Sequence, residues 1–134
     1  MARQCAFRVV WLLAVLSCVS GLGDAGRAAR VASMAKCREV VISPSVAKAD
    51  FFNLGSELSA CVDGGAEWLH FSVQDGRMVP KLSFGSPVVA SLRHHFPDTI
   101  FDVKLGCVDP ENRVDEFLKA GADIISIHPE STLQ

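Results

Sequence analysis

The chain has 134 residues and a formal net charge of −2, with 49% hydrophobic and 21% charged residues. This length and composition predict one ordinary globular domain with a real core and exclude an extensively disordered protein. The low net charge, without a long run of Lys or Arg, gives no electrostatic basis for binding nucleic acid. We therefore expect small molecules or protein surfaces as partners.

Residues 1–23 have the three-part form of a secretory signal peptide. Arg3 and Arg8 precede an apolar run over residues 9–19, and small residues follow it. The run is too short for a comfortable membrane span, so we expect none in the mature chain.

The next segment, residues 24–39, is rich in Ala and Arg over most of its length and fits either a linker or a second targeting segment. Together with the signal peptide it would direct the protein either to the secretory pathway or, as a bipartite leader, to a plastid. Translation from Met34 would instead give a cytoplasmic protein. Residues 40–134 form the body of the chain.

The five cysteines stand at positions 5, 18, 37, 61 and 107, and none has the paired spacing of a zinc or thioredoxin motif. Removal of the signal peptide would leave an odd number of thiols, which argues against a disulfide framework. We expect Cys37, Cys61 and Cys107 to be reduced structural residues.

The body alternates short apolar runs with amphipathic segments. The apolar runs predict strands at Val40–Ile42, Trp68–Val73, Ile100–Leu105 and Asp123–His128. The amphipathic segments predict one helix that is capped by Asp50 and stops at Gly64-Gly65, one that follows Pro87 and reaches Phe96, and one that runs from Asp109-Pro110 to Gly121. Successive strand–helix units require a parallel sheet, so the fold class is α/β.

The segment Glu67–Pro80 carries the most informative pattern, because polar residues alternate with apolar ones along a short strand. Side chains of a strand alternate between its faces, which places His70 and Ser72 next to each other on one face. In a parallel barrel that face points to the interior, and the Asp75-Gly76 turn lies at the strand end where such barrels keep their chemistry. Equally, the His and Ser side chains could simply satisfy each other inside a buried strand.

These residues resemble the ribulose-phosphate 3-epimerase family over Val40–Glu130. The matching pieces are Ser43-Pro-Ser45, Ala49-Asp50, Asn53-Leu-Gly55, Gly65-Ala66, Trp68-Leu-His70, Asp75-Gly76, Met78-Val-Pro80, Phe84-Gly85, Pro87-Val-Val89, Ser91-Leu-Arg93, Phe101-Asp-Val103, Lys119-Ala-Gly-Ala-Asp123 and His128. The resemblance implies a (β/α)₈ TIM barrel, of which this chain would be the N-terminal half. It also implies a divalent metal of the Zn, Fe, Mn or Co type and interconversion of D-ribulose 5-phosphate and D-xylulose 5-phosphate through an enediolate.

The resemblance assigns His70 as a metal ligand and, together with Ser45, as a substrate-binding residue. Two further positions depart from the family. Ser72 occupies the place of the acid/base Asp, and Lys104 occupies the place of a metal-binding His two residues after the matched Asp102. A serine hydroxyl is not a base near neutral pH without a partner, and a protonated Lys repels a cation. No catalytic residue of the family is therefore intact in this part of the chain.

Three readings of the function follow. The chain is a truncated, catalytically impaired epimerase, or it is a non-catalytic binding or regulatory relic that pairs with itself or with a full-length epimerase. In the relic, Ser45, His70, Asp75 and Asp102 are polar residues retained by the fold. The third reading is a changed enzyme, because Asp102-Val-Lys104 resembles part of the Asp-x-Lys-x-x-Asp motif of the orotidine-phosphate decarboxylase and hexulose-phosphate synthase relatives. Cys107 stands in place of the final Asp of that motif.

Overall fold

The computed structural model describes residues 22–36 and 40–131. The helices and strands follow the order α1 (Leu22–Lys36), α2 (Leu54–Asp63), β1 (Trp68–Gln74), α3 (Ser86–His95), β2 (Ile100–Gly106), α4 (Glu111–Lys119) and β3 (Ile124–Ile127). Short 3₁₀ helices lie at Val46–Lys48 (η1) and Pro129–Ser131 (η2). From β1 onward strands and helices alternate, as the sequence pattern predicts.

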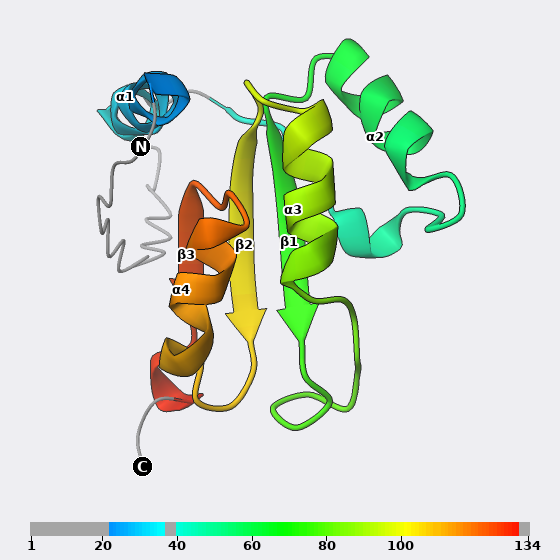
Figure 1. The fold of residues 1–134 in the computed structure, drawn as a ribbon, viewed down its shortest axis with the longest axis vertical. Coiled ribbons are helices and arrows are strands. Elements are labelled where there is room, and N and C mark those ends of the chain that lie inside the picture. The colour runs from blue at the N-terminus through cyan, green and yellow to red at the C-terminus, as the bar shows by residue number, and fades with distance from the viewer. Residues whose placement is uncertain (1–21, 37–39, 132–134) are drawn as a thin grey trace, which may run out of the picture.

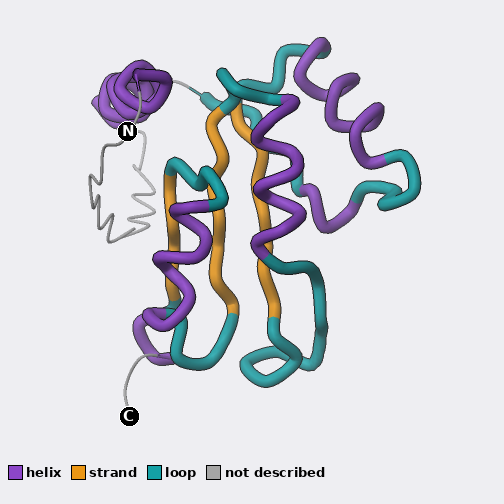
Figure 2. The backbone as a smooth tube through the Cα atoms, viewed as in Figure 1, coloured by secondary structure: helices purple, strands orange, loops and turns teal. Residues whose placement is uncertain are grey.

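The three strands form a parallel sheet in the order β1-β2-β3. Helices α3 and α4 lie side by side over one face of it (Figure 1). The connections β1–α3 and β2–α4 leave the sheet at the same end (Figure 2). This arrangement confirms the α/β class, and it places the carboxyl ends of the strands together, where parallel sheets of this type carry their sites.

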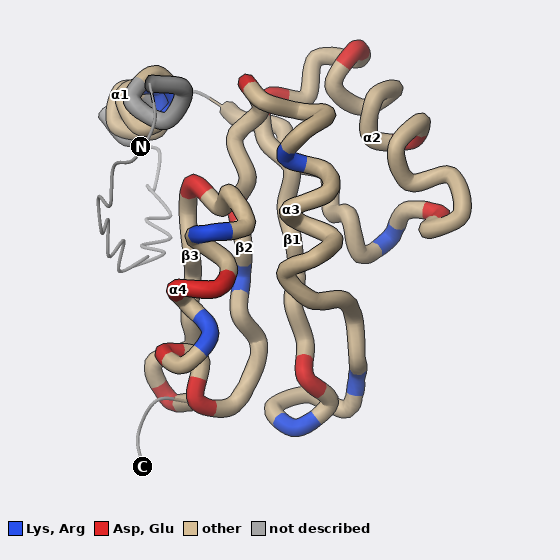
Figure 3. The backbone as a smooth tube through the Cα atoms, viewed as in Figure 1, with Lys and Arg blue, Asp and Glu red and all other residues tan. Residues whose placement is uncertain are grey.

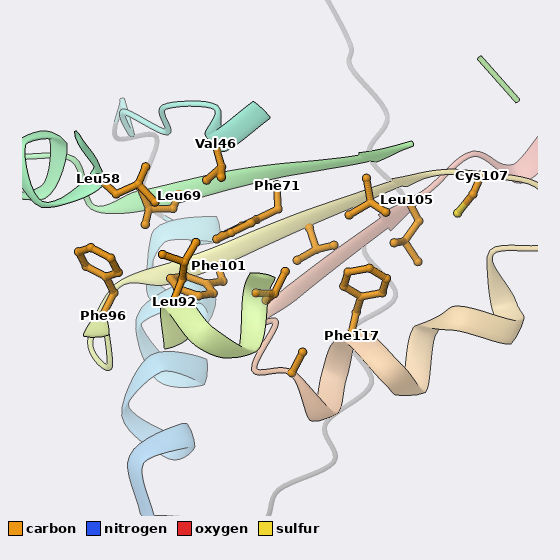
Figure 4. Close-up of a cluster of buried hydrophobic side chains, with 14 residues drawn as sticks. Val46, Leu58, Leu69, Phe71, Leu92, Phe96, Phe101, Leu105, Cys107 and Phe117 are labelled. Atoms are coloured by element: carbon orange, nitrogen blue, oxygen red, sulfur yellow. The ribbon is translucent and has the colours of Figure 1, made fainter. Parts of the chain in front are cut away.

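The core fills the space between the sheet and these two helices and extends to α2 and η1, which contribute Leu58 and Val46 (Figure 4). Every second residue of β1 is buried, and Phe71 at its centre is fully enclosed. The ring of Phe71 lies 4.7 Å from the ring of Phe101 on the neighbouring strand. The helices supply Val89, Leu92 and Phe117 to the same cluster. The period-two pattern of β1 therefore predicts its buried face correctly.

The expected strand at Val40–Ile42 is wrong. This segment has no strand in the structure, and Val40 and Ile42 are 92% and 65% exposed. Within residues 40–45, the pairing with β1 is limited to a single parallel bridge between Ser45 and His70. There the backbone N–H of His70 donates to the carbonyl of Pro44. A strand needs a ladder of hydrogen bonds, and here just one rung forms.

The expected cap of the first body helix is also wrong, because α2 begins at Leu54 with Asn53 at its N-cap position. Asp50 instead organises the turn before the helix. Its carboxylate accepts hydrogen bonds from the Phe52 backbone N–H and the Asn53 side chain at 3.0 and 2.8 Å. A short acidic side chain folds back on nearby donors as readily as it caps a helix, so the residue type alone did not separate the two.

Helix α1 covers much of the segment expected to be a linker or a second targeting segment. Arg27 donates to the Asp123 carboxylate at 2.7 Å and to the carbonyl of Pro97, while Arg30 donates to the carbonyl of Asp98. These contacts hold α1 at the amino ends of β2 and β3 (Figure 1). The signal peptide prediction falls mostly on residues 1–21, outside the described residues.

Arg93 of α3 ties the amino ends of the strands to the helices. Its guanidinium donates to Asp123 at 2.6 Å and to the backbone carbonyls of Gly121 and Thr99, and it lies 3.6 Å above the ring of Phe101. A planar, five-donor group suits this cluster of acceptors better than an ammonium group does. The network is structural, since it lies at the end of the sheet opposite the site described below.

Charges of both signs are interspersed along α4 and the loops next to it (Figure 3). Among residues 22–36 and 40–131, no helix is both long and apolar enough to cross a membrane. Cys61 and Cys107 are free thiols, as predicted, and burial raises the pKa of Cys107. The other three cysteines lie outside the described residues.

Candidate functional site

The polar face of the sheet, opposite the helices, carries the residues that the sequence singles out. The strand register sets His70 of β1 beside Asp102 of β2, and Ser72 beside Lys104. All four side chains are half-buried. Registered neighbours in a parallel sheet share a face, so two pairs that are far apart in sequence meet in one small area.

A chain of two hydrogen bonds links three of these side chains. The His70 Nδ1 atom lies 2.8 Å from Asp102 Oδ2, and the His70 Nε2 atom lies 2.9 Å from Ser72 Oγ. An ionised carboxylate can only accept, so Nδ1 carries the ring proton in the neutral imidazole. Nε2 then accepts from the Ser72 hydroxyl. Both ring nitrogens of His70 are thus engaged within the chain itself.

These residues do not fit the divalent metal that the resemblance implies. The Nε2 atom of His70 faces a hydroxyl, and the neighbouring strand presents the Lys104 side chain in register with Ser72. In the described part of the chain, no group of three His, Cys, Asp or Glu side chains is placed to hold a metal ion. A cationic side chain beside a single imidazole is an unfavourable donor set for a cation.

Ser45, the other predicted substrate-binding residue, lies next to His70 through the bridge already described. The structure therefore brings the His70 and Ser72 side chains together, as the strand pattern predicts, and places the Ser45 backbone beside that of His70. Asp102 joins them through a contact that sequence reasoning did not identify. The sequence does hold one indication of this contact: Asp102 and His70 are each the third residue of consecutive strands, and such residues can lie side by side in a parallel sheet.

A pocket of about 50 Å³ opens beside Ser72 at the carboxyl ends of the strands. It is lined by Ser72, Val73, Gln74, Val79, Lys104, Gly106 and His128. A larger cavity of about 440 Å³ lies on the other side of the sheet, where the core residues Val73, Cys107 and Phe117 form part of its wall. Of these two pockets, the smaller one is lined by Ser72 and Lys104 of the polar face, so it lies beside the His70 hydrogen bonds.

Asp75 organises the loops at the rim of the site. Its Oδ1 accepts from the backbone N–H groups of Arg77 and Met78, and its Oδ2 accepts from that of Val108 at 2.8 Å. Partial burial acts to raise the pKa of this carboxyl, but the backbone hydrogen bonds outweigh it and lower the pKa to about 2. One carboxylate thus joins the loop after β1 to the loop after β2, which is a structural role.

Comparison with known proteins identifies the family. The sequence model of the ribulose-phosphate 3-epimerase family matches residues 41–134. The chain is 45% identical over 93 residues to the ribulose-phosphate 3-epimerase of Synechocystis sp., a match that covers 69% of this chain and 40% of that protein. It is 45% identical over 92 residues to the chloroplastic ribulose-5-phosphate-3-epimerase of Arabidopsis thaliana, covering 69% of this chain and 32% of the relative.

A third relative, the ribulose-phosphate 3-epimerase of Rhodobacter capsulatus, is 40% identical over 94 residues, which are 70% of this chain and 41% of that protein. The chain thus spans about two fifths or less of the length of these relatives. The parallel strand–helix order found here is what part of a TIM barrel requires. On the sequence match and the fold together, this chain belongs to the ribulose-phosphate 3-epimerase family.

Proposed function

We propose that this protein acts on or alongside the pentose phosphates of its family, D-ribulose 5-phosphate and D-xylulose 5-phosphate, and that the polar face of its sheet does not support metal-dependent epimerisation. One observation carries the proposal. Both ring nitrogens of His70 are hydrogen-bonded to side chains of the same face, to Asp102 and to Ser72.

Epimerisation at carbon three needs a base that removes a proton from one face of the sugar and an acid that returns it on the other. A carboxylate can hold that proton, whereas the neutral Ser72 hydroxyl, which donates its own proton to His70 Nε2, is not basic enough to do so. Loss of one positioned acid/base group lowers a rate by roughly 10²- to 10⁴-fold. The Lys104 ammonium adds a repulsive charge where a metal would have to bind.

The first test measures epimerisation directly. The purified chain is incubated with D-ribulose 5-phosphate and Zn²⁺, Fe²⁺, Mn²⁺ or Co²⁺, and NMR follows both xylulose 5-phosphate formation and exchange of the carbon-three proton with deuterated solvent. We expect neither to exceed the rate without protein. Metal-dependent turnover that His70→Ala abolishes would contradict the proposal.

The second test asks whether the two substituted positions prevent metal binding. Calorimetry with Zn²⁺ compares the wild type with the double variant Ser72→Asp/Lys104→His, which supplies a carboxylate and an imidazole beside His70. We expect the variant to bind at least about tenfold more tightly, because ligand and orienting groups each change metal affinity by about 10- to 100-fold. The control Ser91→Asp/Lys119→His makes the same chemical changes at exposed positions of α3 and α4, on the other side of the sheet, and should leave the affinity unchanged. Equal gains in both variants would refute the argument.

A second candidate is a non-catalytic chain that pairs with itself or with a full-length epimerase. The exposed apolar residues Val40 and Ile42 precede the segment that bridges to β1, and Ile127, 44% exposed, lies in β3 at the other edge of the described sheet. Exposed apolar edges favour strand pairing with another chain.

Sedimentation of the chain, alone and mixed with a full-length epimerase, tests this second candidate. We expect a complex that Ile127→Lys weakens, since a charge on an edge strand opposes pairing. Phe52→Lys is the matched control, because Phe52 is 93% exposed but lies before α2, away from the sheet. A monomer under both conditions would exclude pairing.

The start of the mature chain also remains a proposal, with a secretory or plastid leader set against translation from Met34. The structure gives this choice a physical consequence, because a chain that starts at Met34 lacks the Arg27 and Arg30 contacts to the strand ends. N-terminal sequencing of the mature protein distinguishes the starts. A mature chain that begins near residue 24 supports a cleaved leader, whereas one that begins at Met34 excludes it.

A further inference from the structure

Ser72, His70 and Asp102 form a directed hydrogen-bond chain that metal-dependent epimerisation does not use. The Asp102 carboxylate keeps the ring proton on Nδ1, so Nε2 is unprotonated. Nε2 can therefore accept the proton of the Ser72 hydroxyl, 2.9 Å away. A nucleophile within reach of a base, with that base oriented by a third group, is the arrangement that activates a serine.

We propose that Ser72 is an activated nucleophile that accepts small acyl groups from activated carboxylic esters. His70 is its general base, and Asp102 is a positioning residue that holds the imidazole in the required tautomer. This activity is distinct from the chemistry of the family, and it follows from the serine that replaces the family carboxylate together with the retained histidine.

The step balances without any added oxidant or reductant. Ser72 Oγ forms a bond to the ester carbonyl carbon as its proton passes to His70 Nε2, and the carbonyl electrons move onto oxygen. Collapse of this adduct breaks the bond to the leaving alcohol, which takes the proton from His70. Water then attacks the acyl-serine by the same route, releasing a carboxylic acid and restoring Ser72.

The pocket beside Ser72 defines the class of substrate. Its volume of about 50 Å³ leaves room for an acetyl-sized group beside Ser72. The Lys104 side chain lines the same pocket and is in register with Ser72, so its ammonium is the group available to stabilise an oxyanion there. The positive charge that is unfavourable for a metal site is therefore favourable for acyl transfer.

The same sheet face supplies a matched control. Ser126 of β3 is in register with Lys104 on the side opposite Ser72, and it is also half-buried. The two serines share a face and a cationic neighbour, but it is Ser72 that donates to His70 Nε2, while His70 Nδ1–H donates to Asp102. Because the two serines have similar exposure, we attribute a difference in their reactivity to the hydrogen bonds with His70 and Asp102.

The test treats the full chain with a fluorophosphonate, a probe that phosphonylates activated serines with loss of fluoride, and peptide mass spectrometry locates the label. We expect Ser72 to be labelled about 10²-fold or more faster than Ser126, because a positioned general base contributes roughly that factor. Ser72→Ala should abolish the fast label, and Ser126→Ala should leave it unchanged. Equal labelling of the two serines would overturn the proposal.

Two further variants separate base catalysis from simple packing. His70→Gln keeps a hydrogen-bonding side chain of similar size but cannot take the proton, and we expect it to slow Ser72 labelling and p-nitrophenyl acetate hydrolysis by about 10²-fold or more. Asp102→Asn should slow both while leaving the melting temperature within a few degrees, and it should remove the downfield imidazole N–H resonance of His70. An unchanged labelling rate in either variant would overturn the assignment.

Discussion

Replacement of Asp75 by asparagine tests how the loops at the rim of the site are held. The carboxylate accepts three backbone hydrogen bonds, two on Oδ1 from Arg77 and Met78 and one on Oδ2 from Val108. An amide of the same shape keeps only one acceptor oxygen. Asp75→Asn must therefore turn its NH₂ group toward at least one backbone N–H that the carboxylate satisfied.

The expected cost follows from the pKa and from the lost hydrogen bond. For a fully buried carboxyl, a fall in pKa from 3.8 to about 2 corresponds to about 2 kcal/mol of folding free energy, and solvent screening of this half-buried group reduces the figure to about 1 kcal/mol. An unsatisfied N–H gives a similar estimate of about 1 to 3 kcal/mol. The two estimates describe the same hydrogen bonds and are not added together. We therefore expect Asp75→Asn to lower the free energy of unfolding by about 1 to 2 kcal/mol.

Urea denaturation at several pH values is the assay. The folded-state pKa of Asp75 is lowered, so the stability that it contributes is fully present above pH about 4 and is lost as the pH falls toward 2. The gap in unfolding free energy between wild type and Asp75→Asn should shrink over that window. Asp115→Asn, an exposed change on α4, is the control. A gap below about 0.3 kcal/mol at pH 7, or one that stays constant from pH 6 to pH 3, would refute the reasoning.

Three further changes test the core and the Arg93 network by denaturation. Phe71→Ala removes a fully buried ring and should cost about 3 to 5 kcal/mol; a cost below about 1 would contradict the packing. Gly121→Ala places a Cβ 2.7 Å from the Arg93 side chain at a φ of +102° and should lower the free energy of unfolding by more than about 1 kcal/mol. In the control Gly55→Ala the new Cβ meets nothing within 4 Å, so this variant should not be destabilised. Equal effects of the two changes would contradict this reasoning. Arg93→Ala leaves the 9%-exposed Asp123 carboxylate short of a partner and should cost about 3 kcal/mol, which an unchanged urea midpoint would refute.

Local patterns predicted most of the fold because each carries its own physical signal. The alternation along β1 and the helical stripe of α3 follow from which side chains must leave water, and the structure places those residues in the core. Gly65 and Gly121 both adopt positive φ values after a helix, as glycines that end helices are expected to do. The prediction of a strand at Val40–Ile42 was wrong because the apolar composition of a segment does not show whether another strand lies beside it to pair with.

The candidate site was predictable only in part. Strand periodicity is enough to place His70 and Ser72 on one face, and the structure finds their side chains in contact. The partner of the other ring nitrogen is Asp102, 32 residues away along the chain, and it is reached only through the register of two parallel strands. Register depends on how the whole β1–α3–β2 unit packs, which residue spacing in one strand does not contain.

The two faces of the sheet contribute differently to the family match. The apolar face packs against α3 and α4 and fixes strand order, register and loop geometry. A change on the polar face, for example at Ser72 or Lys104, alters charge and hydrogen bonding without entering that core. Family similarity over residues 41–134 therefore reports mainly on the packing that positions the site. The reaction must be inferred from the side chains on the polar face, where a carboxylate, an imidazole and a hydroxyl are joined by hydrogen bonds.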